Sequence, residues 1–302
     1  MDGVLVIDKP AGLTSHDVVN RVRRILQERS VGHLGTLDPL ATGVLPLVAG
    51  RMTRLAQFYT ASEKTYEGVI RFGFATDTYD AEGEPLGPPQ EVKATLEQLR
   101  EVASRFRGHI RQMPPPFSAK KIHGVPAYKL ARKHREVALQ PVDVEIKDFE
   151  LLDWEGAQAR FRARVASGTY MRSVAHEMGQ ILGCGAHLAA LRRTALGEFV
   201  IGDAHTLEDA EAAAQQGRAE ELFIHPRRLL PEMPSVTANE ENVARIRVGR
   251  AVNLPELSRA RQVKVFQGQS ELIAIATRVA GTLFHPKIVL AVEPQTTGKS
   301  SR

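Results

Sequence analysis

The stretch GHLGTLDPLATGVLP, residues Gly32–Pro46, places a single carboxylate, Asp38, among leucines, glycines and hydroxyl residues. An ionised Asp in such surroundings is either satisfied by backbone N–H groups or cations, or has a shifted pKa and a chemical role. Pro39 removes the next N–H and steers Asp38 away from helical backbone angles, so we expect the carboxylate on a shaped loop. The residues alone leave a structural turn acid and a functional acid equally open.

The pattern G-H-x-G-x-L-D-P-x-A-x-G-V-L in this stretch resembles the catalytic loop of the TruB-type tRNA pseudouridine synthases. These enzymes convert the uridine at position 55 in the tRNA T loop. The resemblance implies that Asp38 is the catalytic carboxylate. It also implies that His33 enters the space vacated when the target base flips out, whereas the chain alone is compatible with a structural histidine. Leu34 departs from the family, which commonly has a small polar residue there.

The segment YEGVIRFGF alternates in the way of a strand, with one face formed by Tyr66, Ile70, Phe72 and Phe74. Tyr66 is therefore expected to point inward. Taken alone it would be a core tyrosine whose hydroxyl is satisfied at an edge. The resemblance implies instead that Tyr66 stacks on the target base and takes or relays the C5 proton.

A helix is predicted to begin after a Thr169 cap and to end at Gly183, with a buried stripe of Val174, Met178, Ile181 and Leu182. Arg172 falls in its first turn, where the helix dipole disfavours a cation. We therefore expect a carboxylate partner for Arg172, and Asp38 is the candidate. The alternative is a surface arginine lying over its own helix.

Three further assignments depend on the resemblance. The motif Gly-Thr-Tyr-x-Arg implies that Tyr170 contributes to the base pocket beside Arg172, and AHLAALRRTALG implies that Leu191 walls it. The opening Asp-Lys-Pro-x-Gly motif implies that Lys9, grouped with the substrate-binding residues, supports the site rather than performing chemistry. In ATDTYDAEG the expected structural acid is Asp77.

The segment Arg107–Arg135 holds eight Lys or Arg and no Asp or Glu, interleaved with prolines and aromatics. Such a segment suits contacts to RNA phosphates and bases, and it resembles the RNA-contacting insertion of the family. Lys120 and Lys121 are the expected phosphate-binding residues. A solvated basic loop is the alternative. Arg54, on a short helix predicted over Met52–Tyr59, is also assigned to substrate binding.

Composition indicates a soluble globular protein, and the net charge of +5 with a pI of about 9.4 favours an anionic partner. From charge alone, a merely basic soluble enzyme is equally open. Cys184 is the single cysteine, which excludes an internal disulfide and a cysteine-based metal site. The first residues resemble a strand rather than a signal peptide, and no apolar run reaches transmembrane length. We expect a cytoplasmic protein.

The resemblance implies an α+β fold: a pseudouridine synthase fold with a central mixed, mainly antiparallel sheet flanked by helices, plus a small C-terminal PUA-like β domain. In that domain, strands are predicted over Gln262–Gln267, Glu271–Thr277 and Ile288–Val292. The expected divisions are a catalytic domain (1–228) with an RNA-binding insertion (about 107–140), a PUA-like RNA-binding domain (229–292) and a disordered tail (293–302).

The implied reaction cleaves the N1 glycosidic bond of uridine, rotates the base and rejoins it through C5. Glycoside hydrolysis usually needs two carboxylates, but here water must be excluded, so we expect Asp38 to act without a second acid. Attack at C1′ and removal of the 2′ proton both stay open. No cofactor or metal is implied.

The expected partner is tRNA, held at its T-stem loop and through the C-terminal domain at its acceptor end. The protein is expected to be a monomer that needs no obligate protein partner and contacts no membrane. Two alternatives remain: an RNA-guided pseudouridine synthase, and a tRNA-binding folding factor with secondary modification activity.

Overall fold

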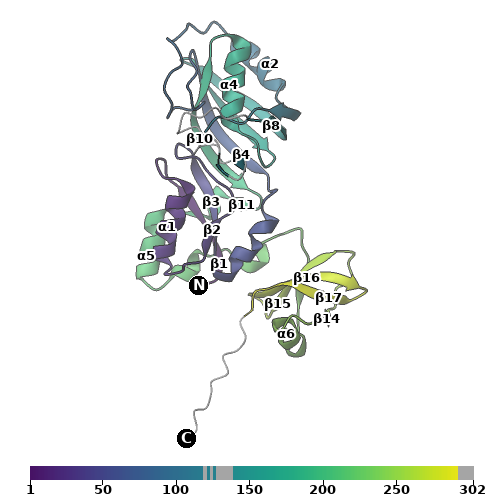
Figure 1. Ribbon diagram of the computed structural model, residues 1–302. Coiled ribbons are helices and arrows are strands. Elements are labelled where there is room, and N and C mark those ends of the chain that lie inside the picture. The colour runs from purple at the N-terminus through teal and green to yellow at the C-terminus, as the bar shows by residue number, and fades with distance from the viewer. Residues whose placement is uncertain (118–120, 123–124, 127–138, 292–302) are drawn as a thin grey trace.

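Two β-sheets organise the molecule (Figure 1). The computed structural model describes residues 1–117, 121–122, 125–126 and 139–291. Ten strands form the large sheet and five form the small one. The large sheet is mixed and mainly antiparallel, because β1 pairs with β12 and β3 with β10 in parallel and its other pairings are antiparallel. The predicted α+β architecture with a small C-terminal β unit is confirmed.

The large sheet has the N-terminal strand next to one edge, and the loop that carries Asp38 leads into the strand beside it. In spatial order its strands are β12 (Ala204–His205), β1 (Gly3–Lys9), β3 (Thr42–Ala49), β10 (Ala186–Leu196), β4 (Lys64–Phe72), β9 (Gln158–Val165), β8 (Val142–Glu155) and β5 (Gly108–Gln112), with β2 (Val31–His33) beside β3 and β11 (Phe199–Val200) beside β10.

Four helices pack on one face of this sheet around a single core. They are α1 (Ser15–Ile25), α2 (Leu96–Ser104), α4 (Met171–Leu182) and α5 (Leu207–Gln215). The shorter elements are η1 (Gly50–Phe58), η2 (Ile201–Asp203), η3 (Ala219–Leu222), η4 (Pro226–Arg228) and the pair β6 (Lys121–Ile122) and β7 (Val125–Pro126). Strand β4 alternates as predicted and buries Tyr66, Ile70 and Phe72 in this core.

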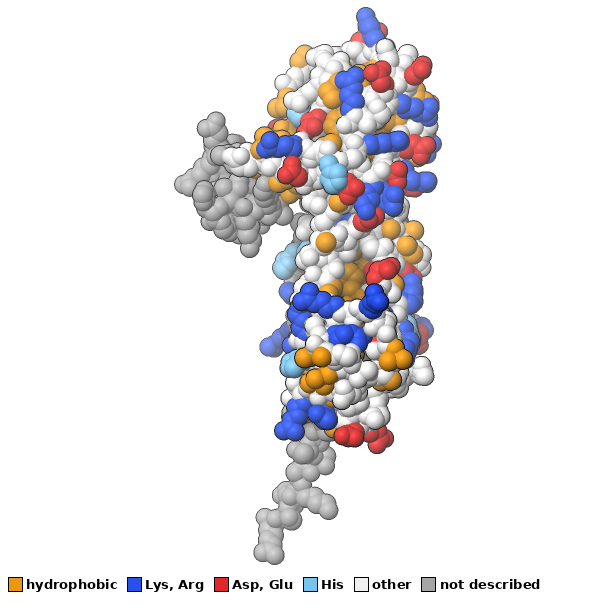
Figure 2. All heavy atoms as spheres, turned by 90° about the vertical axis from the view of Figure 1, so that its right-hand side faces the viewer, with side chains coloured by type: hydrophobic (Ala, Val, Ile, Leu, Met, Phe, Trp, Pro, Cys, Tyr) orange, Lys and Arg blue, Asp and Glu red, His pale blue; other side chains and the backbone are white. Residues whose placement is uncertain are grey.

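The opposite face of β8, β9 and β4 carries charged side chains that pair across the strands. Arg162 pairs with Glu67 at 2.9 Å, and Arg164 pairs with Asp148 at 3.0 Å. Figure 2 shows acidic and basic side chains interspersed over the upper part of one face of the molecule. None of the helices in the described residues is long and apolar enough to cross a membrane.

Helix ends follow local hydrogen bonding. Thr14 caps α1 in a reciprocal pair with Asp17. Thr169 is not the cap of α4: its hydroxyl donates to the Ala166 carbonyl, and the first residue before the helix is Tyr170. Ile181 is 48% exposed rather than buried, because the helix turns that position away from the core.

The small sheet has the order β13 (Ser235–Thr237), β15 (Gln262–Gln267), β16 (Glu271–Ala280), β17 (Leu283–Val289) and β14 (Val252–Asn253), with helix α6 (Glu240–Arg247) packed against it. The last strand begins five residues earlier than the predicted Ile288 start, because its partner β16 runs on to Ala280. The sheet has a core of its own and shares a second apolar cluster with η1 and β11.

The predicted RNA-binding insertion is described only in part. Its first residues, Gly108–Gln112, form β5 at the edge of the large sheet. Lys121 lies in β6, and its side chain is outside the described part. Lys120 and the predicted tail over 293–302 lie outside the described residues.

Candidate active site

The loop that carries Asp38 runs between β2 and β3 and is held from below by buried polar groups. The Ser15 hydroxyl accepts a hydrogen bond from the Leu37 N–H at 2.8 Å and contacts the Leu37 carbonyl at 3.0 Å. Lys9 is fully buried, and its ammonium donates to the Pro39 carbonyl at 3.2 Å. Burial lowers the pKa of Lys9 to about 8, against the charge of Asp38, which raises it. Lys9 therefore supports the loop from beneath and does not line the pocket above it.

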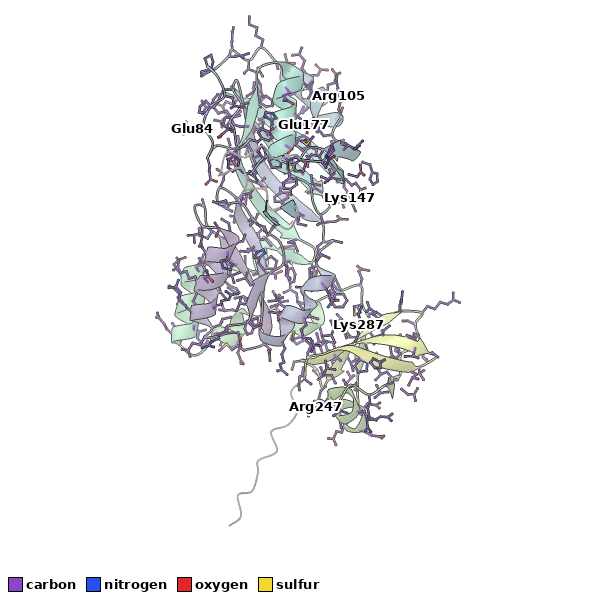
Figure 3. The ribbon with its side chains drawn as sticks, in the orientation of Figure 1. Glu84, Arg105, Lys147, Glu177, Arg247 and Lys287 are labelled. Atoms are coloured by element: carbon purple, nitrogen blue, oxygen red, sulfur yellow. The ribbon has the colours of Figure 1, made fainter. Side chains whose placement is uncertain are left out.

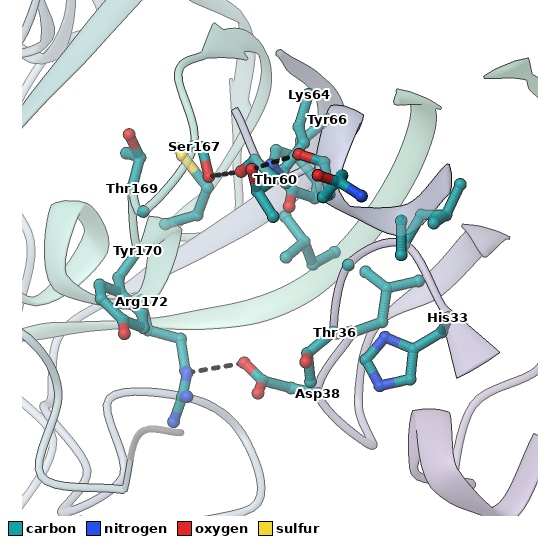
Figure 4. A pocket seen from close by; sticks show the side chains of 18 residues that line it. His33, Thr36, Asp38, Thr60, Lys64, Tyr66, Ser167, Thr169, Tyr170 and Arg172 are labelled. Carbon is teal, nitrogen blue, oxygen red and sulfur yellow. Dashed lines mark hydrogen bonds and ion pairs between the residues drawn. The ribbon is translucent and has the colours of Figure 1, made fainter. Parts of the chain in front are cut away.

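Arg172 forms an ion pair with Asp38, with 3.0 Å between Nε and Oδ2 (Figure 4). The Arg172 side chain is 7% exposed, whereas the Asp38 side chain keeps 40% of its surface open to the pocket. Arg172 also donates to the Thr78 carbonyl at 3.2 Å and to the Phe117 carbonyl at 2.9 Å. The structure thus brings together the acid and the cation that the sequence paired.

A second acid, Asp80, lies against the same guanidinium, 3.4 Å from Arg172 Nη1. Asp80 is 3% exposed and accepts hydrogen bonds from the Thr78 hydroxyl and the Glu82 N–H. The Arg172 guanidinium therefore has a second carboxylate partner, which the sequence did not lead us to expect. The choice of Asp77 as the structural acid of this segment overlooked its neighbour: Asp77 accepts the Glu84 N–H in the turn, and Asp80 is the buried residue.

The electrostatic balance at Asp38 has identifiable causes. Burial raises the pKa of the Asp38 carboxyl, Arg172 opposes that shift, and the negative charge of Asp80 adds to it. Burial likewise lowers the pKa of His33, with a further contribution from Arg193. The neutral ring of His33 can therefore stand beside the loop without adding charge.

Tyr66 points into the pocket from β4 and is 7% exposed. Burial raises the pKa of its hydroxyl, while the charge of Arg193 and a hydrogen bond from it act in the opposite direction. Arg193 is fully buried and donates to three carbonyls around the Asp38 loop, those of Val44 (2.7 Å), Gly35 (2.9 Å) and Thr36 (3.3 Å). One guanidinium therefore connects the loop to the tyrosine.

Sequence reasoning did not single out Arg193, although a signal was present. In AHLAALRRTALG two arginines are adjacent on a strand, so one of them must face the core. Arg192 faces outward and pairs with Asp8 at 2.8 Å, which leaves Arg193 inside.

The pocket has a volume of about 530 Å³ and opens between the loop, β4 and the start of α4. Six predicted site residues line it: His33, Asp38, Tyr66, Tyr170, Arg172 and Leu191. A second cavity of about 590 Å³ lies on the other side of Asp38, His33 and Arg172, and Asp80 and Glu82 line it. The carboxylate can therefore be reached from two sides.

The start of α4 is tied to the segment that leads into the predicted insertion. The buried Gln112 amide donates to the Tyr170 carbonyl at 3.0 Å and accepts the Tyr170 N–H at 2.8 Å. The Ser173 hydroxyl donates to the Met113 carbonyl at 2.6 Å. These bonds, together with that from Arg172 to Phe117, fix the first turn of the helix against this segment.

Arg54 does not belong to the pocket. Its guanidinium donates to the Val289 carbonyl of β17 at 2.6 Å, so it joins η1 to the small sheet. Cys184 and His187 are buried, and His187 Nδ1 lies 3.1 Å from the Phe74 carbonyl. Within the described ranges, no group of three or more His, Cys, Asp or Glu is placed to hold a metal ion.

The arrangement joins an accessible carboxylate, a buried cation that orients it, and a tyrosine over an apolar wall. Such a site suits a reaction in which one carboxylate acts on a bound ring while water is kept away.

Comparisons with known proteins agree on one family. Family models match residues 23–171 (TruB family pseudouridylate synthase, N terminal domain) and 172–233 (tRNA pseudouridylate synthase B C-terminal domain). The chain is 52% identical to tRNA pseudouridine synthase B of Solibacter usitatus over 293 residues, covering 96% of this chain and 100% of that protein. It is 39% identical to tRNA pseudouridine synthase B of Aquifex aeolicus over 292 residues, with the same two coverages.

Solved structures show the same fold. A Cbf5-Nop10-Gar1 complex contains a chain with a TM-score of 0.67 and 26% identity, covering 97% of this chain and 84% of that one. An H/ACA RNP bound to a substrate RNA containing 2′-deoxyuridine gives a TM-score of 0.70 at 24% identity, covering 96% and 85%. The two matched family models end before β13, so neither covers the small sheet.

Proposed function

The chain belongs to the TruB family of pseudouridylate synthases, and from this premise we propose that the Asp38 pocket isomerises uridine to pseudouridine in the tRNA T loop. The enzyme is a tRNA pseudouridine synthase, an isomerase whose substrate is tRNA. The observation that carries the assignment of the site is the 3.0 Å ion pair between Arg172 and Asp38 in a pocket lined by Tyr66 and Leu191.

In the proposed mechanism Asp38 acts at the ribose of the target nucleotide. Arg172 keeps the carboxylate ionised and oriented, and Asp80 fixes Arg172 from its other side. Uracil departs as a stabilised anion, turns over and rejoins C1′ through C5. Attack of Asp38 on C1′ and abstraction of the 2′ proton both fit this placement.

The base is proposed to lie between Tyr66 and Leu191, with Tyr170 closing the pocket. Stacking on an aromatic ring favours a flipped base, and flipping costs a few kcal/mol that such contacts offset. Tyr66 then takes or relays the C5 proton. Because its hydroxyl is hydrogen-bonded to Arg193, it is held by the same cation that anchors the Asp38 loop.

Tritium release from C5-labelled target uridine in a T-loop transcript tests this assignment. We expect rapid release with the wild-type protein and none above background with Asp38→Asn. Asp77→Asn is the matched control, because it makes the same change in a loop outside the pocket. Full release by Asp38→Asn would contradict the proposed role of the carboxylate.

Related measurements distinguish a stand-alone synthase from an RNA-guided synthase and from a tRNA-folding factor. An RNA-guided synthase would need a guide, so modification of bare T-loop RNA excludes that requirement. The 52% identity to a tRNA pseudouridine synthase B, against 24–25% to chains of H/ACA complexes, favours guide-free action. For a tRNA-folding factor, Asp38→Asn should abolish modification and leave tRNA refolding unchanged.

The chain is proposed to divide into two domains. Residues 1–228 form the catalytic domain with an insertion over about 107–140, and 229–292 form a PUA-like domain that contacts the acceptor end of tRNA. A separate core beneath the small sheet supports this division. The enzyme acts as a monomer in the cytoplasm, where its tRNA substrate is found, and light scattering of the purified chain tests the first point.

A further inference from the structure

Lys64 is a cation in the active-site pocket that the mechanism does not use. It precedes Tyr66 by two residues on β4, so both side chains point to the same face of the sheet. Lys64 is half-buried, lines the pocket, and donates one hydrogen bond, to the Ser62 carbonyl at 2.8 Å. An ammonium has three donors. Among the described residues no carboxylate lies within ion-pair distance of it.

A second unbalanced cation stands next to it. Arg193 bonds to carbonyls and to the Tyr66 hydroxyl, and in the described part of the chain it has no acidic partner. Gly35 separates the two: a Cβ at this position would lie 3.5 Å from Arg193 Nη1 and 3.7 Å from Lys64 Cε. By contrast, Arg172 has two carboxylates, Asp38 and Asp80.

Two cations without an acid raise the free energy of the empty pocket, and a bound anion would lower it. Burial and the charge of Arg193 lower the pKa of Lys64 to about 8, which agrees with a site that has no anion of its own. Arg193 is fully buried, so only Lys64 can touch the anion, and Arg193 contributes through its field.

Hydroxyl and amide groups complete this end of the pocket. Gln57, Thr60 and Ser167 line it, and the Ser167 hydroxyl donates to the Thr60 carbonyl at 2.7 Å. Figure 4 shows Lys64, Thr60 and Ser167 toward the end opposite the Asp38–Arg172 ion pair. The Thr60 hydroxyl donates to the Gln57 carbonyl at 3.1 Å, so both hydroxyls already use their protons, and the free donors at this end are the two remaining N–H groups of the Lys64 ammonium. An ammonium with two free donors matches the oxygens of a phosphodiester group.

We propose that Lys64, with Thr60 and Ser167 beside it, binds a backbone phosphate of the RNA next to the target uridine. This inference depends on the proposed function of the Asp38 pocket. A phosphate is a better candidate ligand for Lys64 than the departing uracil anion, because the base is assigned to the space between Tyr66 and Leu191. Lys64 lies two residues along the strand from Tyr66, a separation of about 7 Å.

The test measures binding of a T-stem-loop RNA to the full-length protein over a series of salt concentrations. Lys64→Met should weaken binding about tenfold and reduce the slope of log K against log salt by about 0.7 to 0.9, the loss of one phosphate contact. Lys64→Arg should keep the slope. Lys147→Met is the control: this lysine pairs with Glu63 outside the pocket (Figure 3) and should leave binding unchanged.

RNAs with a single neutral methylphosphonate identify the contact. One position beside the target should weaken wild-type binding and have no further effect on Lys64→Met. If Lys64→Met binds with the wild-type slope and responds to every methylphosphonate as the wild type does, the proposal is overturned. A slower isomerisation of bound RNA without a change in slope would overturn it in favour of a contact to the base.

Circular dichroism establishes whether Lys64→Met folds. Where it does not, Lys64→Gln takes its place, and a wild-type protein that tolerates every methylphosphonate beside the target overturns the proposal by itself. Failure of the proposed function looks different, because the wild-type protein would then form no pseudouridine in the unmodified RNA.

Discussion

The Asp38 pocket and the junction between the two sheets both bury charged side chains, but they partner them differently. At the junction, Lys264 is 2% exposed, and its ammonium donates to the carbonyls of Arg227 (3.1 Å) and Leu229 (2.6 Å). Glu198 accepts from the Tyr59 hydroxyl and the Leu230 N–H, both at 2.8 Å. In the pocket, the Lys64 ammonium donates to a single carbonyl, that of Ser62, and the Asp38 side chain is 40% exposed.

The difference indicates what each region contributes. Buried charges whose donors and acceptors are matched hold a structure in one arrangement, whereas incompletely partnered charges are available to a ligand. Substitutions in the pocket should therefore lower activity and spare stability. Those at the junction should do the reverse.

The largest expected effect is that of Asp38→Asn on activity. Loss of the carboxylate should lower the single-turnover rate of tritium release by roughly 10³-fold or more. The melting temperature should not fall, because burial disfavours the charged form of Asp38 in the folded protein. A fall in melting temperature together with the loss of activity would contradict the expected separation between pocket and junction residues.

Arg193→Met should have the next largest effect. Like the charges at the junction, Arg193 is buried and bonded to carbonyls, and it also contacts Tyr66 in the pocket. Losing its contacts to the loop and to Tyr66 should lower the rate roughly 10²-fold and also reduce stability. The pairing is tested by a double-mutant cycle with Tyr66→Phe at saturating RNA. If Arg193 acts through Tyr66, the combined loss will be smaller than the product of the two. Arg192→Met, on the outward face, is the control.

Lys264→Met should show the junction pattern. Removing the ammonium leaves the buried Leu229 carbonyl and the part-buried Arg227 carbonyl without this donor, which costs about 1–3 kcal/mol of unfolding free energy. Urea denaturation measures that loss. Tritium release from T-loop RNA should stay at the wild-type rate below the unfolding transition, and a large drop in activity would mean that the junction acts on the pocket.

The smallest expected effect is a shift in pH dependence. The pKa of Asp38 is raised by burial above its ordinary value of 3.8, so the rate should fall on the acid side at a higher pH than an ordinary aspartate would cause. Asp80→Asn removes a negative charge that contributes to this rise and should move the acid limb to lower pH. A pH–rate profile of both proteins measures the shift, and an unmoved limb would contradict the coupling.

Ionisation of Asp38 also lowers the stability of the folded protein, because the pKa of Asp38 is raised on folding. The folded state holds the Asp38 proton more tightly than the unfolded chain does. Asp38 therefore contributes a loss of stability that develops as pH rises from 3.8 through its raised pKa. Asp38→Asn should remove that part of the pH dependence of unfolding.

Much of the fold and of the pocket could be predicted from local patterns and motif resemblance. Alternation placed Tyr66 on the core face of β4, and the position of Arg172 in the first helical turn indicated its need for an acid. Both arguments use only residues that are close in sequence. In the structure Tyr66 lines the pocket and Arg172 pairs with Asp38.

The missed features depend on backbone angles and long-range contacts. Asp77 and Asp80 are equivalent by composition, but the left-handed backbone of Tyr79 (φ 67°) belongs to a turn that buries Asp80. Arg54 lies on a 3₁₀ helix, whose three residues per turn change the direction of each side chain, and its partner is 235 residues away. No local pattern reports either fact.

The hydrogen bonds between the start of α4 and residues 112–117 have a mechanical consequence. Gln112, Met113 and Phe117 are bonded to the same turn that presents Arg172, so a displacement of this segment is transmitted to the guanidinium. A ligand that shifts residues 112–117 would therefore also shift the group that orients Asp38. An RNA that fits the pocket but does not engage that segment would be discriminated against in turnover as well as in affinity.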